Sequence, residues 1–276
     1  MVPSTDGVEL AVHDLGGAGA ALLVSHATGF HGRCYQPLAD QLATTRCIAF
    51  DYRGHGDTPR PAGELDWPRY GDDAEAMAQW LATREGGPID AFGHSMGGAC
   101  LLMAAHRRPE LFRRIVAFEP IVFPPTVSPG AAEDSAMVQG ARRRRSTFPS
   151  YAAAIANYSA KPPLNAFTPE ALAAYVHHGF APDGHGHVHL KCTTDTEATT
   201  FAGGPSHDTW RHLPAILTEV VVIAGRTEPM QPSAIAVQIA EQLPNGRYEQ
   251  YDDLDHFGPM THPREMAQII ADALER

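Results

Sequence analysis

The chain has 276 residues, of which 43% are hydrophobic and 19% are charged, a balance typical of soluble globular proteins and unlike that of disordered or fibrous ones. Its formal net charge of −11 argues against a nucleic-acid partner, because binding phosphates requires a basic surface. The one concentrated positive run, residues 142–145, consists of four arginines that would point around most of a helix. We interpret this run as a solvated cluster and not as an anion site.

The four cysteines are scattered, with no C-x-x-C spacing, and Cys47 and Cys100 lie in apolar runs that are typical of a core; the other two are Cys34 and Cys192. Residues 1–15 contain no basic segment followed by an apolar stretch, and no segment is apolar for the length of a membrane span. We therefore expect a cytoplasmic location in a reducing compartment, with no membrane partner.

Short strand-like runs recur along the chain, with helical runs between them. The strands are predicted at residues 8–13, 20–25, 46–50, 89–92, 114–118, 219–224 and 247–251, and the main helices at residues 72–84, 97–106, 232–243 and 263–274. This alternation predicts an α/β fold with a mostly parallel central sheet flanked by helices. Residues 21–24 and 220–223 are continuously apolar, as strands buried on both faces require.

The regular alternation stops after Phe118 and resumes at Glu219. Between these points lie proline-rich joints, short helical stretches and a histidine-rich stretch. We interpret residues 123–205 as an inserted, mainly helical cap over the C-terminal edge of the sheet, and residues 1–122 and 206–276 as the core.

The pentapeptide Gly93-His94-Ser95-Met96-Gly97 follows a predicted strand and opens a predicted helix. A serine between two glycines at such a joint is typical of a nucleophile elbow, a turn so tight that only glycine fits two residues before and after the serine. The turn places Ser95 at a helix N-terminus, where free N–H groups favour negative charge on a substrate oxygen. We predict that Ser95 is a nucleophile; the alternative is a chance match in a glycine-rich chain.

A serine hydroxyl needs a base within hydrogen-bond reach and an acid that orients the base. His256 is the predicted base, because its loop lies between the last predicted strand and the final helix; the alternative is a surface histidine in an acidic turn. Glu228, in the loop after the strand at 219–224, is the predicted acid, since the order Ser95, Glu228, His256 then gives nucleophile, acid and base. Glu119 is the rival acid, and an ordinary loop ion pair is the alternative for either glutamate.

An oxyanion hole requires two backbone N–H groups. Met96, which follows the nucleophile, is predicted to supply one. The other should come from the loop after the second core strand, where Thr28 is the predicted donor and Gly29 its rival. His26 is predicted to brace this loop by hydrogen bonding, and His94 to be structural, because neighbouring side chains diverge at a sharp turn.

These motifs resemble those of the α/β-hydrolase family over residues 8–118 and 219–274. Beyond the elbow, the matching motifs are Asp-Tyr-Arg-Gly-His-Gly at residues 51–56, which resembles a turn of that family, and His256-Phe257 followed by His262-Pro263, which resembles its catalytic-histidine loop and the start of its last helix. The resemblance implies an α/β-hydrolase fold. Family members with an aspartate at the elbow, the epoxide hydrolases and haloalkane dehalogenases, are excluded by Ser95.

The resulting hypothesis is a serine hydrolase that cleaves a small or medium carboxylic ester or lactone through an acyl-enzyme, with no cofactor. A C–C bond hydrolase and a cofactor-free perhydrolase would use the same residues and stay open as alternatives. A non-catalytic ligand receptor on the same fold is the alternative from another class, and it predicts no covalent labelling of Ser95.

The histidine-rich stretch offers a metal site as a competing interpretation. His185, His187 and His189 alternate and would share one face of a strand, and three histidines with water suffice for zinc. The elbow already gives a metal-free mechanism, however, and residues 183–186 are typical of a turn. We therefore predict a polar hairpin in the cap and no metal site.

Overall fold

The computed structural model describes residues 1–128, 130, 132–229 and 231–275. Pro129 and Ala131 of the predicted cap, together with Met230 and Arg276, lie outside the described residues. The central sheet of the described part contains seven strands, in the order β12 (Gly246–Gln250), β11 (Glu219–Ala224), β7 (Phe112–Phe118), β6 (Ile89–His94), β4 (Ala21–Ser25), β5 (Arg46–Phe50) and β3 (Val12–Asp14). All neighbours pair in parallel except β3, which is antiparallel to β5, so the mostly parallel sheet is confirmed.

Both faces of the sheet are buried, which explains the uninterrupted apolar runs. Leu22 and Val24 of β4 pack into the hydrophobic core on one face, whereas Leu23 packs into the core on the other. In β11, Val221 and Val222 divide between the two cores in the same way. Successive side chains of a strand point to opposite faces, so a strand covered on both sides needs an apolar residue at every position.

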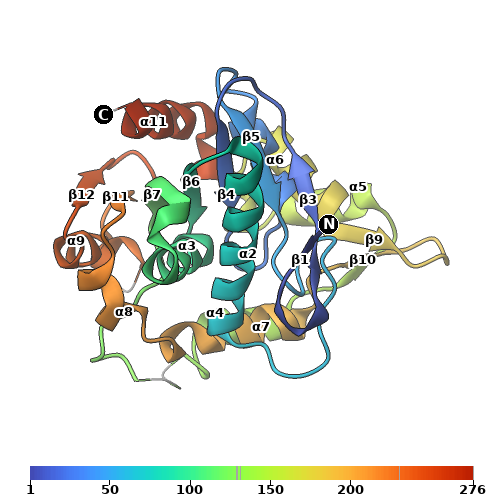
Figure 1. Cartoon of the computed structure of the whole chain (residues 1–276). Helices are drawn as coiled ribbons and strands as arrows, with labels where there is room; N and C mark the ends of the chain where they lie inside the picture. Colours follow the sequence, from blue (N-terminus) through green and yellow to red (C-terminus); the bar gives the residue numbers. More distant parts are fainter. Residues whose placement is uncertain (129, 131, 230, 276) are drawn as a thin grey trace.

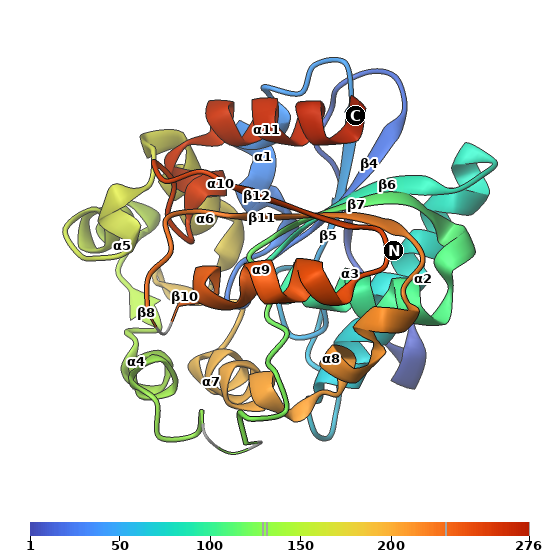
Figure 2. The ribbon, with the colours of Figure 1, turned by 90° about the vertical axis from the view of Figure 1, so that its left-hand side faces the viewer.

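Helices cover each face of the sheet (Figures 1 and 2). One face carries α2 (Trp67–Glu85), α3 (Met96–Arg107) and α9 (Ser233–Gln242), with the short α8 (Thr209–His212) beside α3. The other face carries α1 (Gln36–Ala39) and α11 (Pro263–Glu275), with the short α10 (Gly258–Thr261) against α11. A two-stranded ribbon of β1 (Val2–Pro3) and β2 (Glu9–Leu10) packs beside α2.

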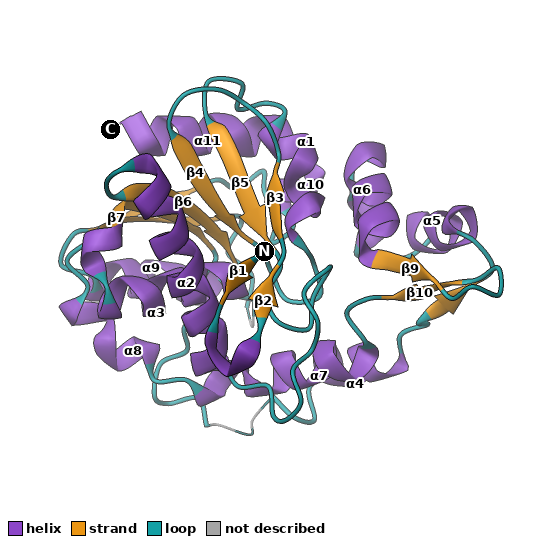
Figure 3. Ribbon diagram, turned by 45° about the vertical axis from the view of Figure 1, so that its right-hand side comes forward, coloured by secondary structure: helices purple, strands orange, loops and turns teal. Residues whose placement is uncertain are grey.

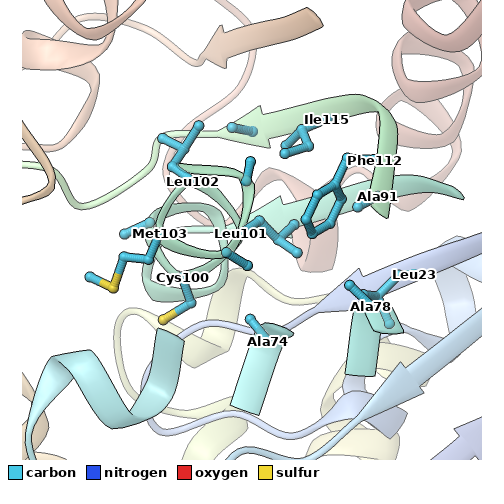
Figure 4. Packing of buried hydrophobic residues seen from close by; sticks show 14 of the residues in the cluster. Leu23, Ala74, Ala78, Ala91, Cys100, Leu101, Leu102, Met103, Phe112 and Ile115 are labelled. Atoms are coloured by element: carbon cyan, nitrogen blue, oxygen red, sulfur yellow. The ribbon is translucent and has the colours of Figure 1, made fainter. Parts of the chain in front are cut away.

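Helix α3, which begins directly after Ser95, is buried along most of its length. Cys100 and Leu101 of this helix pack between α2 and the sheet, against Ala74 of α2 and Ile115 of β7, as Figure 4 shows. A helix that is apolar on nearly all sides must lie inside the protein, so α3 gives the elbow a rigid support.

The segment between β7 and β11 holds α4 (Ala136–Arg143), α5 (Tyr151–Ser159), α6 (Pro169–Gly179) and α7 (Thr194–Gly203). It also holds a small antiparallel sheet in the order β8 (Thr147–Phe148), β10 (Val188–Leu190) and β9 (Phe180–Pro182), visible beside the core in Figure 3. We refer to residues 123–205 as the inserted segment. Its helix α6 packs on the 3-10 helix η2 (Gly32–Tyr35), close to the loop after β4.

The remaining 3-10 helices are η1 (Thr5–Gly7), η3 (Pro109–Leu111), η4 (Leu164–Ala166), η5 (Gly204–Ser206) and η6 (Leu213–Ala215). All four cysteines are buried and free. Strands β9 and β10 pair around a turn in which Asp183 accepts from the backbone N–H groups of His185 and His187, so the predicted hairpin is confirmed. None of the described helices has both the length and the apolar character needed to span a membrane.

Candidate active site

Ser95 stands in the strained turn that the sequence predicts. Its backbone has φ 58° and ψ −116°, and it lies between the end of β6 and the first residue of α3. A Cβ atom added at Gly97 would lie 2.1 Å from the carbonyl oxygen of Ser25, and one at Gly93 would lie 2.7 Å from the Cα atom of Gly98. Both distances are far below van der Waals contact, so the turn requires glycine at these two positions.

The topology brings two loops together at this turn. Strand β4 pairs with β5 on one side and with β6 on the other, so the strand order reverses between β4 and β6. In open α/β sheets, ligands bind outside the carboxyl ends of the strands at such a reversal. The loop after β4 and the elbow after β6 lie at this point.

His256 joins Ser95 to a buried carboxylate. Its Nε2 atom lies 3.2 Å from the Oγ atom of Ser95, and its Nδ1 atom lies 2.6 Å from Oε2 of Glu119. Glu119 directly follows β7, is 1% exposed and has a φ of +46°, an unusual value for a residue with a side chain. The other carboxylate oxygen accepts a hydrogen bond from the backbone N–H of Gly225 at 2.9 Å. Glu119 is therefore fixed on both oxygens.

The structure contradicts the expected contact between Glu228 and His256. Glu228 is 49% exposed and forms an ion pair with Arg226 at 3.2 Å. The physical reason lies in the strand order: β7 lies between β6 and β11, so the end of β7 is the nearer neighbour of the elbow. The loop after β11 contacts Glu119 through the backbone N–H of Gly225, while Glu228 of this loop pairs with Arg226.

The residues predicted for the oxyanion hole lie against each other. Met96 is the first residue of α3, so its N–H belongs to the free first turn of the helix. The Thr28 hydroxyl donates to the sulfur of Met96 at 3.4 Å, which holds the loop after β4 beside the elbow. Gly29, the rival donor, has a φ of +77°, and its carbonyl accepts from the Tyr175 hydroxyl at 3.5 Å.

A hollow of about 280 Å³ opens beside His256 and Glu119. The inserted segment contributes Pro162, Pro163, Asn165 and Ala166 to its wall, and the core contributes further residues including Phe257. Ser95 is not among its lining residues, so this hollow adjoins the His256–Glu119 end of the site and does not define the space for a substrate at the nucleophile.

Comparison with known proteins agrees with this architecture. The model of a family described as the alpha/beta hydrolase family matches residues 21–269. The chain belongs to the alpha/beta hydrolase family.

Two curated relatives illustrate the likeness in sequence. Lipase LipV of Mycobacterium tuberculosis is 33% identical over 116 residues, which span 42% of this chain and 43% of the lipase. The 2-(acetamidomethylene)succinate hydrolase of Mesorhizobium japonicum is 31% identical over 104 residues, which span 37% of this chain and 36% of that enzyme. The matched stretches therefore span less than half the length of these relatives.

Solved structures of alpha/beta hydrolases match over nearly the whole chain. The crystal structure of E-2-(acetamidomethylene)succinate hydrolase has a TM-score of 0.82 at 22% identity, covering 100% of this chain and 98% of that one. The enol-lactonase from Burkholderia xenovorans has a TM-score of 0.70 at 19% identity, covering 98% of both chains. At these identities the likeness shows the fold.

In this alpha/beta hydrolase, His26 braces the loop after β4, as the sequence predicts. Its Nε2 atom accepts from the backbone N–H of Tyr52 at 3.0 Å, and its Nδ1 atom lies 2.8 Å from the carbonyl oxygen of Ala27. Complete burial and then the neighbouring His55 lower the pKa of His26 to about 3, so the ring is neutral at physiological pH. His26 therefore acts as a fixed hydrogen-bonding spacer.

The turn that follows β5 is held by a buried carboxylate. Asp51 contacts Nε2 of His13 at 2.9 Å and accepts from the backbone N–H groups of Gly32 and Asp57. Burial alone would raise the pKa of Asp51, but the contact with His13 brings it well below its usual value. Within the described residues, His13, Asp51 and Asp57 bring three potential metal-ligand atoms within 4.8 Å of one another. We interpret them as structural, because Asp57 in turn pairs with Lys191 at 2.6 Å.

A charged pair of the inserted segment lies against the loop after β4. Arg144 alone of the arginine run turns inward, with 16% of its side chain exposed, and binds both carboxylate oxygens of Glu197 at 2.9 and 3.0 Å. It also donates to the hydroxyls of Tyr158 and Tyr175. A Cβ atom at Gly29 would lie 2.5 Å from Glu197, so this cluster is in contact with the loop. Sequence reasoning missed it, because a run of four arginines does not reveal which one is buried.

Proposed function

We propose that this protein is a serine hydrolase of small or medium carboxylic esters or lactones. The observation that carries the proposal is the continuous chain of contacts from Ser95 through His256 to the buried Glu119. The relatives named lipase, esterase and hydrolase support the same class of reaction. The inserted segment, in this proposal, is the cap that closes the site and selects the substrate.

The contacts support one arrangement of protons in the proposed resting site. An ionised Glu119 can only accept, so Nδ1 of His256 carries a proton and donates it to the carboxylate. Nε2 of His256 then carries no proton, and its lone pair accepts from the Ser95 hydroxyl. This tautomer is the one that a general base requires, and Glu119 also stabilises the imidazolium that forms when the base takes the proton.

The reaction follows from these positions. Ser95 Oγ attacks the carbonyl carbon of the substrate while its proton passes to Nε2 of His256, and the carbonyl oxygen becomes an oxyanion. The N–H groups of Met96 and Thr28 bind that oxyanion. His256 then gives its proton to the leaving oxygen, which departs and leaves an acyl group on Ser95. A water molecule repeats the sequence, releasing the acid and restoring the serine hydroxyl.

The experiment that tests the proposal is covalent labelling with a fluorophosphonate, followed by mass spectrometry of the labelled peptide. The proposal expects one phosphonyl group, on Ser95, and no labelling of Ser95→Ala. Folded protein that takes up no label would reject the hydrolase and favour a non-catalytic receptor. A panel of p-nitrophenyl esters and lactones of increasing acyl length then defines the substrate class.

A further inference from the structure

We propose that Tyr35 and His94 are positioning residues that fix the base, His256, relative to the oxyanion loop. This inference rests on the proposed hydrolase function and extends it to two residues that do not touch the reacting atoms. The observation behind it is a buried line of hydrogen bonds that runs from Ala27 through Tyr35 and His94 to the backbone of His256.

The direction of every bond in this line is determined. The carbonyl oxygen of His256 can only accept, so Nε2 of His94, 2.8 Å away, carries the proton. Nδ1 of His94 is then an acceptor and must receive the hydroxyl proton of Tyr35, also 2.8 Å away. The Tyr35 oxygen in turn accepts from the backbone N–H of Ala27 at 3.1 Å. One arrangement of protons therefore satisfies all three bonds.

The line joins segments that the sheet alone does not hold together. Tyr35 ends η2, and His94 ends β6 immediately before Ser95. Ala27 directly precedes Thr28 in the predicted oxyanion loop, and His256 lies in the loop between β12 and α10. The nucleophile, the base and an oxyanion donor must each be held within about 0.5 Å of the productive geometry. Small displacements of such groups reduce rates strongly.

The line is also kept uncharged. Tyr35 and His94 are fully buried, and burial, followed by the nearby His256, holds the pKa of His94 well below its usual value. The titratable groups around the His94 ring are Tyr35, His256 and His26. The His94 and His256 rings are only 5.0 Å apart, so a charged His94 would oppose the protonation of His256 that catalysis requires. A neutral His94 positions the base without weakening it.

The first test is Tyr35→Phe, which removes one oxygen atom and keeps the aromatic ring. With p-nitrophenyl butyrate as the substrate probe, we expect kcat to fall about 10- to 100-fold with KM changed less than about 3-fold, since the loss affects positioning and not binding. Tyr70→Phe is the matched control, because Tyr70 is equally buried and its hydroxyl bonds to Thr200 of α7 and not to a residue of the hydrogen-bond line. Equal kcat values for the two variants would overturn the proposal.

The second test is rescue at His94. Glutamine can donate its amide N–H to the His256 carbonyl and accept from Tyr35, whereas leucine can do neither. We expect His94→Gln to retain at least 10-fold more of the wild-type kcat than His94→Leu, and equal losses would overturn the proposal. If His94→Leu does not fold, the comparison of Tyr35→Phe with Tyr70→Phe still decides.

Fluorophosphonate labelling separates the two proposals. Wild-type protein without label on Ser95 would reject the hydrolase itself. Normal wild-type labelling, combined with a Tyr35→Phe labelling rate equal to that of Tyr70→Phe, would reject the positioning role alone.

Discussion

In the proposed mechanism, Glu119 is the residue on which the chemistry depends most, apart from Ser95 and His256. Its two carboxylate oxygens have different partners, the His256 ring on one and the Gly225 backbone on the other. The side chain of Glu119, which is one methylene longer than that of aspartate, reaches from the end of β7 to the ring of His256. Its left-handed backbone is strained, and such strain persists only where surrounding structure enforces it.

Glu119→Gln should lower kcat by about 10³- to 10⁴-fold, because an amide at this position no longer favours the Nδ1 proton or stabilises the imidazolium. Glu228→Gln is the control, and we expect it to stay within about 3-fold of the wild type, since Glu228 pairs with Arg226 at the surface. Steady-state rates with one p-nitrophenyl ester measure both. The opposite result, a large loss only in Glu228→Gln, would exclude Glu119 as the acid.

The sequence predicts Ser95 and the contacting histidine, because an elbow and a loop before the last helix are local features. It does not distinguish Glu119 from Glu228, since each glutamate follows a core strand. The choice between them depends on the order of strands across the sheet, and one sequence does not define that order. Pro120, two residues after β7 ends at Phe118, is the local sign that the chain leaves the sheet at that edge. Tyr35 was missed for a similar reason, because its partners are distant in sequence.

At the scale of elements, helix α2 shows how an N-cap residue sets the position at which a helix begins. The apolar periodicity predicts a helix at residues 72–84, yet α2 begins at Trp67. Asp66 caps it by accepting from the N–H of Arg69 at 3.0 Å, and Pro68 lies in the first turn. Trp67 and Tyr70 of the first turn are buried and continue the apolar spacing of the helix, so these aromatic residues together with the Asp66 cap mark where it begins.

Asp66→Ala should reduce the free energy of unfolding by about 1 kcal/mol, because the first turn of α2 loses its side-chain acceptor. Asp66→Asn keeps an acceptor oxygen in the same place and should stay within a few tenths of a kcal/mol of the wild type. Urea unfolding followed by circular dichroism measures both variants. Equal stabilities for the alanine and asparagine variants would show that the N-cap side chain contributes nothing to the free energy of unfolding.

The ion pair of the inserted segment predicts a different pattern of stability. Arg144→Met leaves Glu197 buried without its partner and should cost about 3–5 kcal/mol, whereas Arg144→Met combined with Glu197→Leu should cost less than the single change. Arg226→Ala, at an exposed pair, should cost less than about 1 kcal/mol. Urea unfolding at pH 7 compares the three. A double variant less stable than Arg144→Met would contradict this account.

For the whole molecule, the apolar runs predict the sheet because burial on two faces leaves no room for polar side chains. The inserted segment is predictable only as an interruption of that pattern, since its short helices and three-stranded sheet depend on contacts with the core. The core also contains polar residues that the runs do not indicate. Five of them are histidines, at positions 13, 26, 31, 55 and 94, and the burial of such groups links the stability of the whole protein to pH.

His26, His31, His55, His94 and His207 should make this protein unstable in mild acid. Burial lowers their pKa values from 6.5, to about 3 for His26, to about 4 for His31, His55 and His207, and well below the usual value for His94. Between pH 6.5 and about 4 the unfolded chain binds protons at these positions and the folded chain does not, so the free energy of unfolding falls as the pH falls, by at most about 1.4 kcal/mol per pH unit for each histidine. Urea unfolding at pH 7, 6, 5 and 4.5 measures the slope. His207→Gln should reduce this slope by the equivalent of about one proton taken up on unfolding. His185→Gln, at an exposed position, is the control and should leave the slope as in the wild type. A slope that is the same in all three proteins would show that His207 is not a source of the pH dependence.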